Sequence, residues 1–136
     1  MKKSSSQYWS RGRHNKDKKK VLLYQPVDEK FEPKGLMKFS TYYKQNGYKV
    51  RFCRSTEIQV LRSHFDIIRI DFGYLENNFN QSLELTKWLV NRFPKADILI
   101  GGVLASRKYD ELCQIFGKKR VHFGVIIYLE SVKEDS

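Results

Sequence analysis

The chain has 136 residues, a formal net charge of +11, 40% hydrophobic residues and 14% aromatic residues. This length and composition are typical of one globular domain with its own core, and they exclude a wholly disordered chain. Cys53 and Cys113 match neither a CxxC pair nor a zinc-binding spacing, and no apolar run approaches the roughly 20 residues that cross a bilayer. We therefore expect a reduced, cytoplasmic protein with no membrane partner.

The first segment, residues 1–20, has almost no apolar periodicity. It carries eight cations and one acid (+7), whereas the other 116 residues carry 18 cations and 14 acids (+4). We predict a disordered basic arm, which either binds RNA or DNA without specificity or serves as a solubilising or linker segment. The arm residues expected to contact nucleic acid are Lys2, Lys3, Trp9, Arg11, Arg13, Lys18, Lys19 and Lys20.

The first half of the folded part alternates between strand and helix patterns. "VLLYQP" (21–26) predicts a buried strand that ends at Pro26 and opens into a loop reaching Gly35. Apolar residues at helical spacing predict a helix over 36–45, which the following Asn-Gly pair ends. "YKVRFCR" (48–54) predicts a second strand, and "STEIQVLRSHF" (55–65) predicts a short helix.

The second half continues the alternation. "DIIRID" (66–71) predicts a third strand, and residues 77–93 predict a helix that Pro94 ends. "ADILI" (96–100) predicts a fourth strand, and 106–116 a helix that Gly117 ends. "RVHFGVIIYLE" (120–130) predicts a fifth strand, followed by a C-terminal tail at 131–136.

This alternation predicts right-handed crossovers and an α/β domain over 21–130. We expect a flavodoxin-like (Rossmann-like) three-layer sandwich with a five-stranded parallel sheet in the order 2-1-3-4-5. Ligands of such sheets bind outside the carboxyl ends of the strands. The segments that form this edge are Gln25–Gly35, Asp71–Tyr74, Gly101–Ser106 and Tyr128–Glu130.

Three segments in this order carry a family resemblance: "KKVLLYQPVDEKFEPKGLMKFSTYYKQNGYKVRF", "FDIIRIDFGY" and "LTKWLVNRFPKADILIGGVLAS". Together they resemble the cobalamin-binding-type N-terminal domain of many radical SAM enzymes, over about residues 19–130. The resemblance implies a cofactor-binding or docking domain at the carboxyl edge of the sheet. The positions it implies for cofactor binding are Gln25, Pro26, Asp28, Lys30, Gly35, Asp71, Gly73, Gly101, Gly102 and Ser106.

The chain also departs from this family. Lys30 and Pro33 stand where the cobalamin-ligating D-x-H-x-x-G motif has its His and its Gly, and a lysine ammonium has no lone pair for cobalt. Asp71 and Gly73 replace the serine motif after the third strand, so the identity of the cofactor is left open and cobalamin is disfavoured. The CxxxCxxC motif of the radical SAM barrel is missing, so we expect any such enzyme to be a separately encoded partner.

Several features have two interpretations. Gly101 and Gly102 either admit a cofactor's tail or form a strand-to-helix turn that needs positive φ. Asp71 either faces a ligand or caps the next loop. The acidic loop residues Asp28, Glu29 and Glu32 either bind a cation or are solvated.

No set of catalytic residues can be assembled from this sequence, and no metal site is predicted. His14 lies in the arm, where we expect it to be solvated, and His64 and His122 stand beside apolar residues, where an ordinary hydrogen-bonded histidine is favoured over a ligand. We therefore predict a non-catalytic module resembling a degenerate cobalamin-binding domain. The alternative is a nucleic-acid-associated protein that uses its basic arm on an α/β scaffold.

Overall fold

Four strands form the centre of the fold in a computed structural model that describes residues 19–27 and 34–123. They are β1 (Lys20–Gln25), β2 (Lys49–Arg54), β3 (Ile67–Asp71) and β4 (Asp97–Gly101), all parallel, in the order β2-β1-β3-β4. Val21 is in register with Val50 on one side and with Ile67 on the other, so β1 is an inner strand. The predicted α/β class, the parallel sheet and the order of these four strands are confirmed.

The expected fifth strand over 120–130 is not present as a strand in the described residues. Lys118–Arg120 form a short 3-10 helix, η4, and Val121 makes one isolated parallel bridge to Ile100. Residues 124–130 lie outside the described part. Within the described residues the sheet therefore has four strands, and the chain returns beside β4 for one bridged residue.

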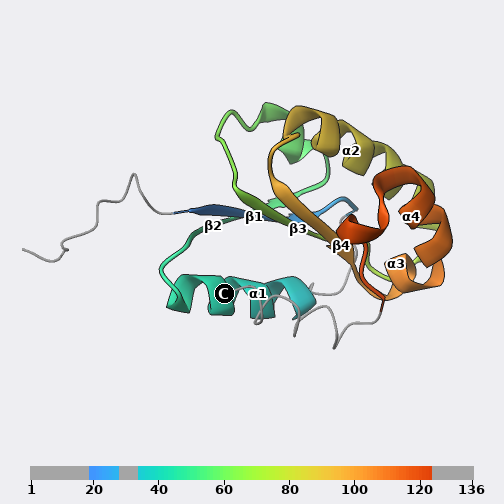
Figure 1. Cartoon of the computed structure of the whole chain (residues 1–136), viewed down its shortest axis with the longest axis horizontal. Coiled ribbons are helices and arrows are strands. Elements are labelled where there is room, and N and C mark those ends of the chain that lie inside the picture. The colour runs from blue at the N-terminus through green and yellow to red at the C-terminus, as the bar shows by residue number, and fades with distance from the viewer. Residues whose placement is uncertain (1–18, 28–33, 124–136) are drawn as a thin grey trace, which may run out of the picture.

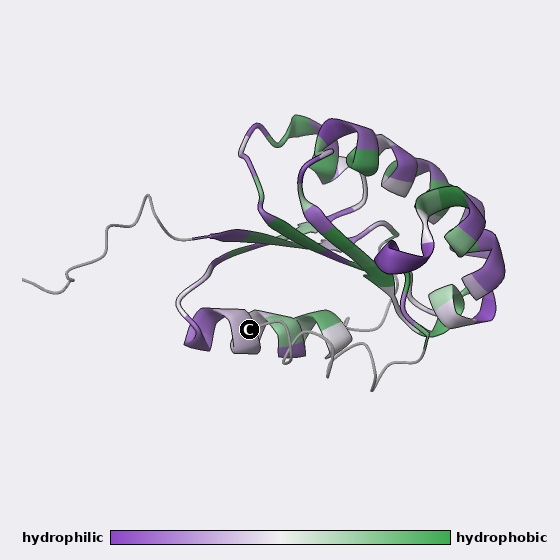
Figure 2. Ribbon diagram, viewed as in Figure 1, coloured by the Kyte–Doolittle hydropathy of each residue, from purple (hydrophilic) through white to green (hydrophobic). Residues whose placement is uncertain are grey.

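Helices cover both faces of the sheet (Figure 1). α1 (Lys34–Gln45) lies on one face, and α2 (Phe79–Arg92), α3 (Val103–Arg107) and α4 (Tyr109–Phe116) lie on the other. Each crossover helix returns the chain to the amino end of the next strand, as parallel strands require. Figure 2 shows β1, β3 and β4 as the most hydrophobic ribbons, enclosed between these two helical layers.

Alternate residues of each strand enter two separate cores. Leu22, Ile68 and Ile98 join the larger core beneath α2, α3 and α4. Leu23 and Leu99 join the smaller core beneath α1. Strands buried on both faces are nearly continuous apolar runs, which explains why "VLLY" and "DILI" identified two of the strands.

Helix boundaries follow local signals. α1 ends where Gly47 adopts φ +83, and α4 ends where Gly117 adopts φ +93, as the sequence predicts. The helix predicted over 106–116 is instead two helices, α3 and α4, which meet at Lys108. The short helix predicted over 55–65 is the 3-10 helix η2 (Ser55–Val60), and a second 3-10 turn, η3 (Glu76–Asn78), precedes α2.

Arg69 is a buried cation in the middle of β3, with 1% of its surface exposed. Its Nη1 donates to the carbonyl oxygen of Asp97 at 3.1 Å, and its Nη2 lies 3.5 Å from Asp97 Oδ2. Its guanidinium carbon also stands 6.0 Å from the centre of the Tyr43 ring on α1. This cation ties β3 to the start of β4 on the α1 side of the sheet.

Two buried side chains that can ionise, a tyrosine and a cysteine, lie near the carboxyl ends of β1 and β2. The Tyr24 hydroxyl donates to the carbonyl oxygen of Ser55 at 2.7 Å, and burial raises the pKa of this phenol well above its usual range. Burial also raises the pKa of the Cys53 thiol from 9.0 to about 11. Both groups are therefore held in their neutral forms by the fold.

We predict that stability falls as the pH rises above 9, partly because of Cys53. The unfolded thiol ionises near pH 9.0 and the folded one near 11, so its contribution is complete below pH 9 and is lost progressively between these values. Urea denaturation at pH 8, 9 and 10 should show a steeper loss of stability in the parent chain than in Cys53→Ala. An equal loss in both chains would contradict the assignment.

Candidate functional site

Three of the predicted site residues end neighbouring strands at one edge of the sheet. Gln25 is the last residue of β1, Asp71 the last of β3 and Gly101 the last of β4. The chain leaves β1 for α1 on one face and leaves β3 for α2 on the other, so the order of connections reverses between them (Figure 1). Such a point is where open α/β sheets bind ligands.

The Asp71 carboxylate forms a hydrogen bond within the loop that follows β3. Its Oδ1 accepts a hydrogen bond from the Gly73 backbone N–H at 2.7 Å. Its Oδ2 lies 3.9 Å from the position that a β-carbon of Gly35 would occupy in the first turn of α1. A carboxylate is favoured beside the amino end of a helix, and the bond to Gly73 closes a tight turn. The capping interpretation thus accounts for Asp71.

Gly102 stands against this same carboxylate. Its backbone has φ +106 and ψ 171, a conformation that is essentially restricted to glycine. A β-carbon here would collide with Asp71 Oδ1 and would lie 3.3 Å from the backbone nitrogens of Phe72 and Gly73. The turn interpretation therefore accounts for Gly102, because the space beside it is filled by the loop after β3.

Two backbone hydrogen bonds tie these loops together. The Phe72 N–H donates to the Gly101 carbonyl oxygen at 3.0 Å, and the Leu104 N–H donates to the Gly73 carbonyl oxygen at 2.8 Å. Ser106 belongs to the same turn, since its hydroxyl donates to the Gly102 carbonyl oxygen at 3.3 Å.

A buried amide and a guanidinium occupy the β1–β2 side of the edge. Gln25 is 3% exposed, and its Oε1 accepts a hydrogen bond from Arg54 Nε at 3.2 Å. The Arg54 guanidinium carbon also stands 5.0 Å from the centre of the Phe52 ring. Pro26 is buried directly after Gln25. Sequence analysis did not identify Arg54, although its place at the end of the second predicted strand was a signal.

Exposed apolar side chains surround the β3–β4 side of the edge, and we call Tyr74, Leu75, Val103 and Phe123 the apolar rim. Their exposed fractions run from 36% for Tyr74 to 60% for Phe123. Tyr74 and Leu75 directly follow Gly73, whose carbonyl accepts the Leu104 N–H. Sequence analysis missed this group, although two of its members directly follow the glycines at the two strand ends.

Phe123 joins the apolar rim through the chain that returns beside β4. The His122 N–H donates to the Ile100 carbonyl oxygen at 3.0 Å, which places the next residue beside the end of β4. The Phe123 ring packs edge-on against Tyr109, with 5.7 Å between the ring centres. The rim residues therefore come from the loop after β3, from the start of α3 and from the returning segment that packs against the start of α4.

The remaining predicted positions are separate from this edge or lie outside the described residues. Asp28, Lys30 and residues 2–18 of the predicted arm are outside, as are Glu29, Glu32 and Tyr128–Glu130. Lys20 is the first residue of β1, and the Lys19 carbonyl accepts the Lys49 N–H at 3.0 Å. These two residues thus belong to the sheet.

Within residues 19–27 and 34–123, no three His, Cys, Asp or Glu side chains gather closely enough to hold a metal ion. None of the helices in these ranges has the length and apolar character needed to cross a membrane. Comparison with models of protein families finds no match for the chain, and a search of curated proteins finds none either. The edge geometry is therefore the basis for any statement about function.

Gly102→Ala should destabilise the fold more than Gly117→Ala. Both glycines have φ near +100 and strongly positive ψ, so each substitution costs about 1–3 kcal/mol in backbone strain. Only Gly102 has Asp71 against the added β-carbon, whereas nothing lies within 4 Å of that position at Gly117. We expect an extra loss of about 1–3 kcal/mol at Gly102 in urea denaturation. Asp71→Ala in the Gly102→Ala background should recover part of it, and strictly additive effects would contradict the contact.

Proposed function

We propose that this chain is a non-catalytic docking module of the cobalamin-binding-like type, and that it binds a separately encoded radical SAM enzyme through the carboxyl edge of its sheet. The observation that carries the proposal is the apolar rim at that edge. Exposed apolar groups gathered at one place on a protein are typical of a protein interface.

The polar neighbours of the rim suit a protein partner. The ion pair between Lys108 Nζ and Glu76 Oε1, 3.0 Å long, flanks the loops that carry Leu75 and Val103. The Lys108 ammonium also stands 5.3 Å from the centre of the Phe79 ring. An apolar centre bordered by charged groups is the common arrangement of interfaces that form and dissociate.

The loop contacts favour docking over cofactor binding. In the family that the chain resembles, the Gly-Gly strand end is where a cobalamin tail approaches the backbone. Here the Asp71 carboxylate fills the space beside Gly102, and it is bound by the Gly73 N–H. An anionic side chain in that position opposes the phosphate of a nucleotide tail. Lys30, which stands in place of the cobalt-ligating His, also disfavours cobalamin binding.

Leu75→Asp combined with Val103→Asp should weaken the complex with the partner enzyme at least tenfold, because two carboxylates would be desolvated at the contact. The measurement is isothermal titration calorimetry against the radical SAM enzyme encoded in the same genome. The matched control is Val60→Asp with Ile115→Asp, which adds the same charge at two exposed apolar residues outside the rim. Equal affinities for the two double variants, or no complex with the parent chain, would contradict the proposal.

Hydroxocobalamin tests the cofactor alternative directly. We expect no shift in its visible spectrum on titration with tens of micromolar protein, and no corrinoid retained after gel filtration, because Lys30 cannot ligate cobalt as His does. A spectral shift with the parent chain, or corrinoid retained after gel filtration, would instead support cofactor binding and overturn the docking proposal.

A further inference from the structure

β2 is an outer strand whose side chains differ between the two faces of the sheet. Among the described strands it pairs with β1 alone. Cys53 belongs to the larger core, so strand alternation puts Lys49 and Arg51 on that face, where both are exposed. Val50 packs against the smaller core, so Phe52 lies on the α1 face, where it is 41% exposed. One face of this edge is therefore cationic, and the other holds an apolar side chain and a partly exposed ring.

The backbone of β2 also has an inner and an outer side. The Lys49 N–H donates to the Lys19 carbonyl oxygen at 3.0 Å, on the side of β1. Backbone groups alternate in direction along a strand, so those of Val50 and Phe52 point away from β1. The N–H and C=O groups of these two residues therefore form the outer edge of the sheet.

A carboxylate closes the carboxyl end of this edge. Arg54 is the next residue whose backbone points outward, and its N–H donates to Glu57 Oε1 at 2.9 Å. The Arg54 side chain is directed to β1, since its Nε donates to Gln25 Oε1 at 3.2 Å. The edge that can accept another strand is thus the part that contains Val50 and Phe52.

The cations of this edge are not neutralised by acids of the described fold. None of the ion pairs among the described residues includes Lys49 or Arg51. Lys20 is in register with Lys49, so the residue opposite Lys49 on β1 is another cation. Carboxylates on an added strand would relieve this repulsion.

A second copy of β2 does not suit this edge. Two β2 strands joined about a two-fold axis would bring Lys49 and Arg51 of both copies together on the same face of a continuous sheet. Cations on an outer strand are a common means of preventing such pairing. The same cations attract a strand whose residues on that face are acidic.

We propose that the outer edge of β2 binds an extended segment of a partner protein as an added strand, in which acidic residues alternate with apolar ones. The acidic residues meet Lys49 and Arg51 on one face of the sheet, and the apolar residues cover Val50 and Phe52 on the other. Backbone hydrogen bonds to the outward groups of Val50 and Phe52 join the two strands. This edge is separate from the apolar rim, so the inference stands whether or not the docking proposal holds.

The test is fluorescence anisotropy of the full chain with a labelled peptide in which Glu and Val alternate. A peptide of the same composition, with its Glu and its Val residues in two blocks, is the control for charge alone. We expect the alternating peptide to bind at least tenfold more tightly, because only alternation places every carboxylate on the cationic face.

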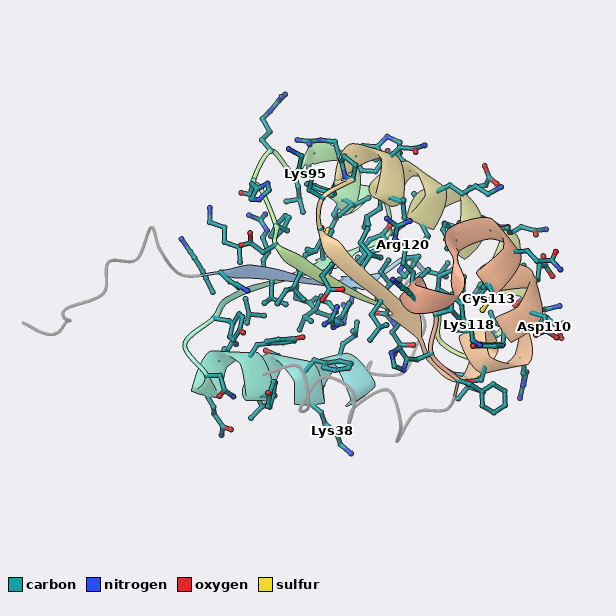
Figure 3. All side chains as sticks on the ribbon, in the orientation of Figure 1. Lys38, Lys95, Asp110, Cys113, Lys118 and Arg120 are labelled. Atoms are coloured by element: carbon teal, nitrogen blue, oxygen red, sulfur yellow. The ribbon has the colours of Figure 1, made fainter. Side chains whose placement is uncertain are left out.

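Lys49→Glu with Arg51→Glu should weaken binding of the alternating Glu-Val peptide at least tenfold and should confer binding of a Lys-Val peptide, because the charge of the face is reversed. The matched control is Lys38→Glu with Lys95→Glu, which makes the same change of charge at two exposed lysines on α1 and before β4 (Figure 3). The control should change either affinity less than threefold. Thermal unfolding by circular dichroism shows whether each variant remains folded.

Backbone methylation tests strand addition itself. Only every second N–H of an added strand faces β2, so a peptide methylated on its Glu nitrogens and one methylated on its Val nitrogens should differ at least tenfold in affinity. In the protein, Phe52→Pro removes an outward N–H that β1 does not use, whereas Phe52→Ala retains it. We expect Phe52→Pro to bind the alternating peptide at least fivefold more weakly than Phe52→Ala.

Four results would overturn the inference. The first is no binding of the alternating peptide by the parent chain, and the second is equal affinity for the two methylated peptides. The third is an equal loss of affinity in the Lys49/Arg51 variant and the Lys38/Lys95 control, which would indicate a general charge effect. The fourth is a dimer of the parent chain in sedimentation that Phe52→Pro dissociates, which would identify a second copy as the occupant of the edge.

Discussion

The absence of a side chain at Gly102 is the constraint on which the carboxyl edge depends. Because no β-carbon is present, the Asp71 carboxylate can stand against the turn after β4 while it accepts the Gly73 N–H. The Leu104 N–H then reaches the Gly73 carbonyl oxygen at 2.8 Å. These contacts bring the loops after β3 and β4 together, and Leu75 and Val103, which lie close to them in sequence, are exposed.

The two outer parts of the sheet have opposite characters. At the β4 side the returning chain makes a single bridge through Val121, and the neighbouring surface is apolar. At the β2 side the exposed side chains are two cations and one aromatic ring, Lys49, Arg51 and Phe52. An exposed apolar surface of this kind is typical of a protein interface.

The fold was predictable because its signals are local. "VLLY" and "DILI" are apolar runs of strand length, and Gly47 and Gly117 end α1 and α4 through their positive φ. The division of the predicted helix 106–116 at Lys108 has no comparable signal in the sequence. The fifth strand was predicted from the strand-like composition of "RVHFGVIIYLE", whereas in its described part Arg120 ends a 3-10 turn and only Val121 bridges to β4.

The sequence by itself determined the α/β class, the parallel sheet and the meeting of Gln25, Asp71 and Gly101 at one edge, because alternating strands and helices have few ways to connect. Only the tertiary structure decided what these residues do there. It placed the Asp71 carboxylate against Gly102, paired the Gln25 amide with Arg54, and buried Arg69 between Asp97 and Tyr43. Each of these contacts joins residues that lie far apart in the chain, and their distances follow from the packing of strands and helices, which periodicity alone does not encode.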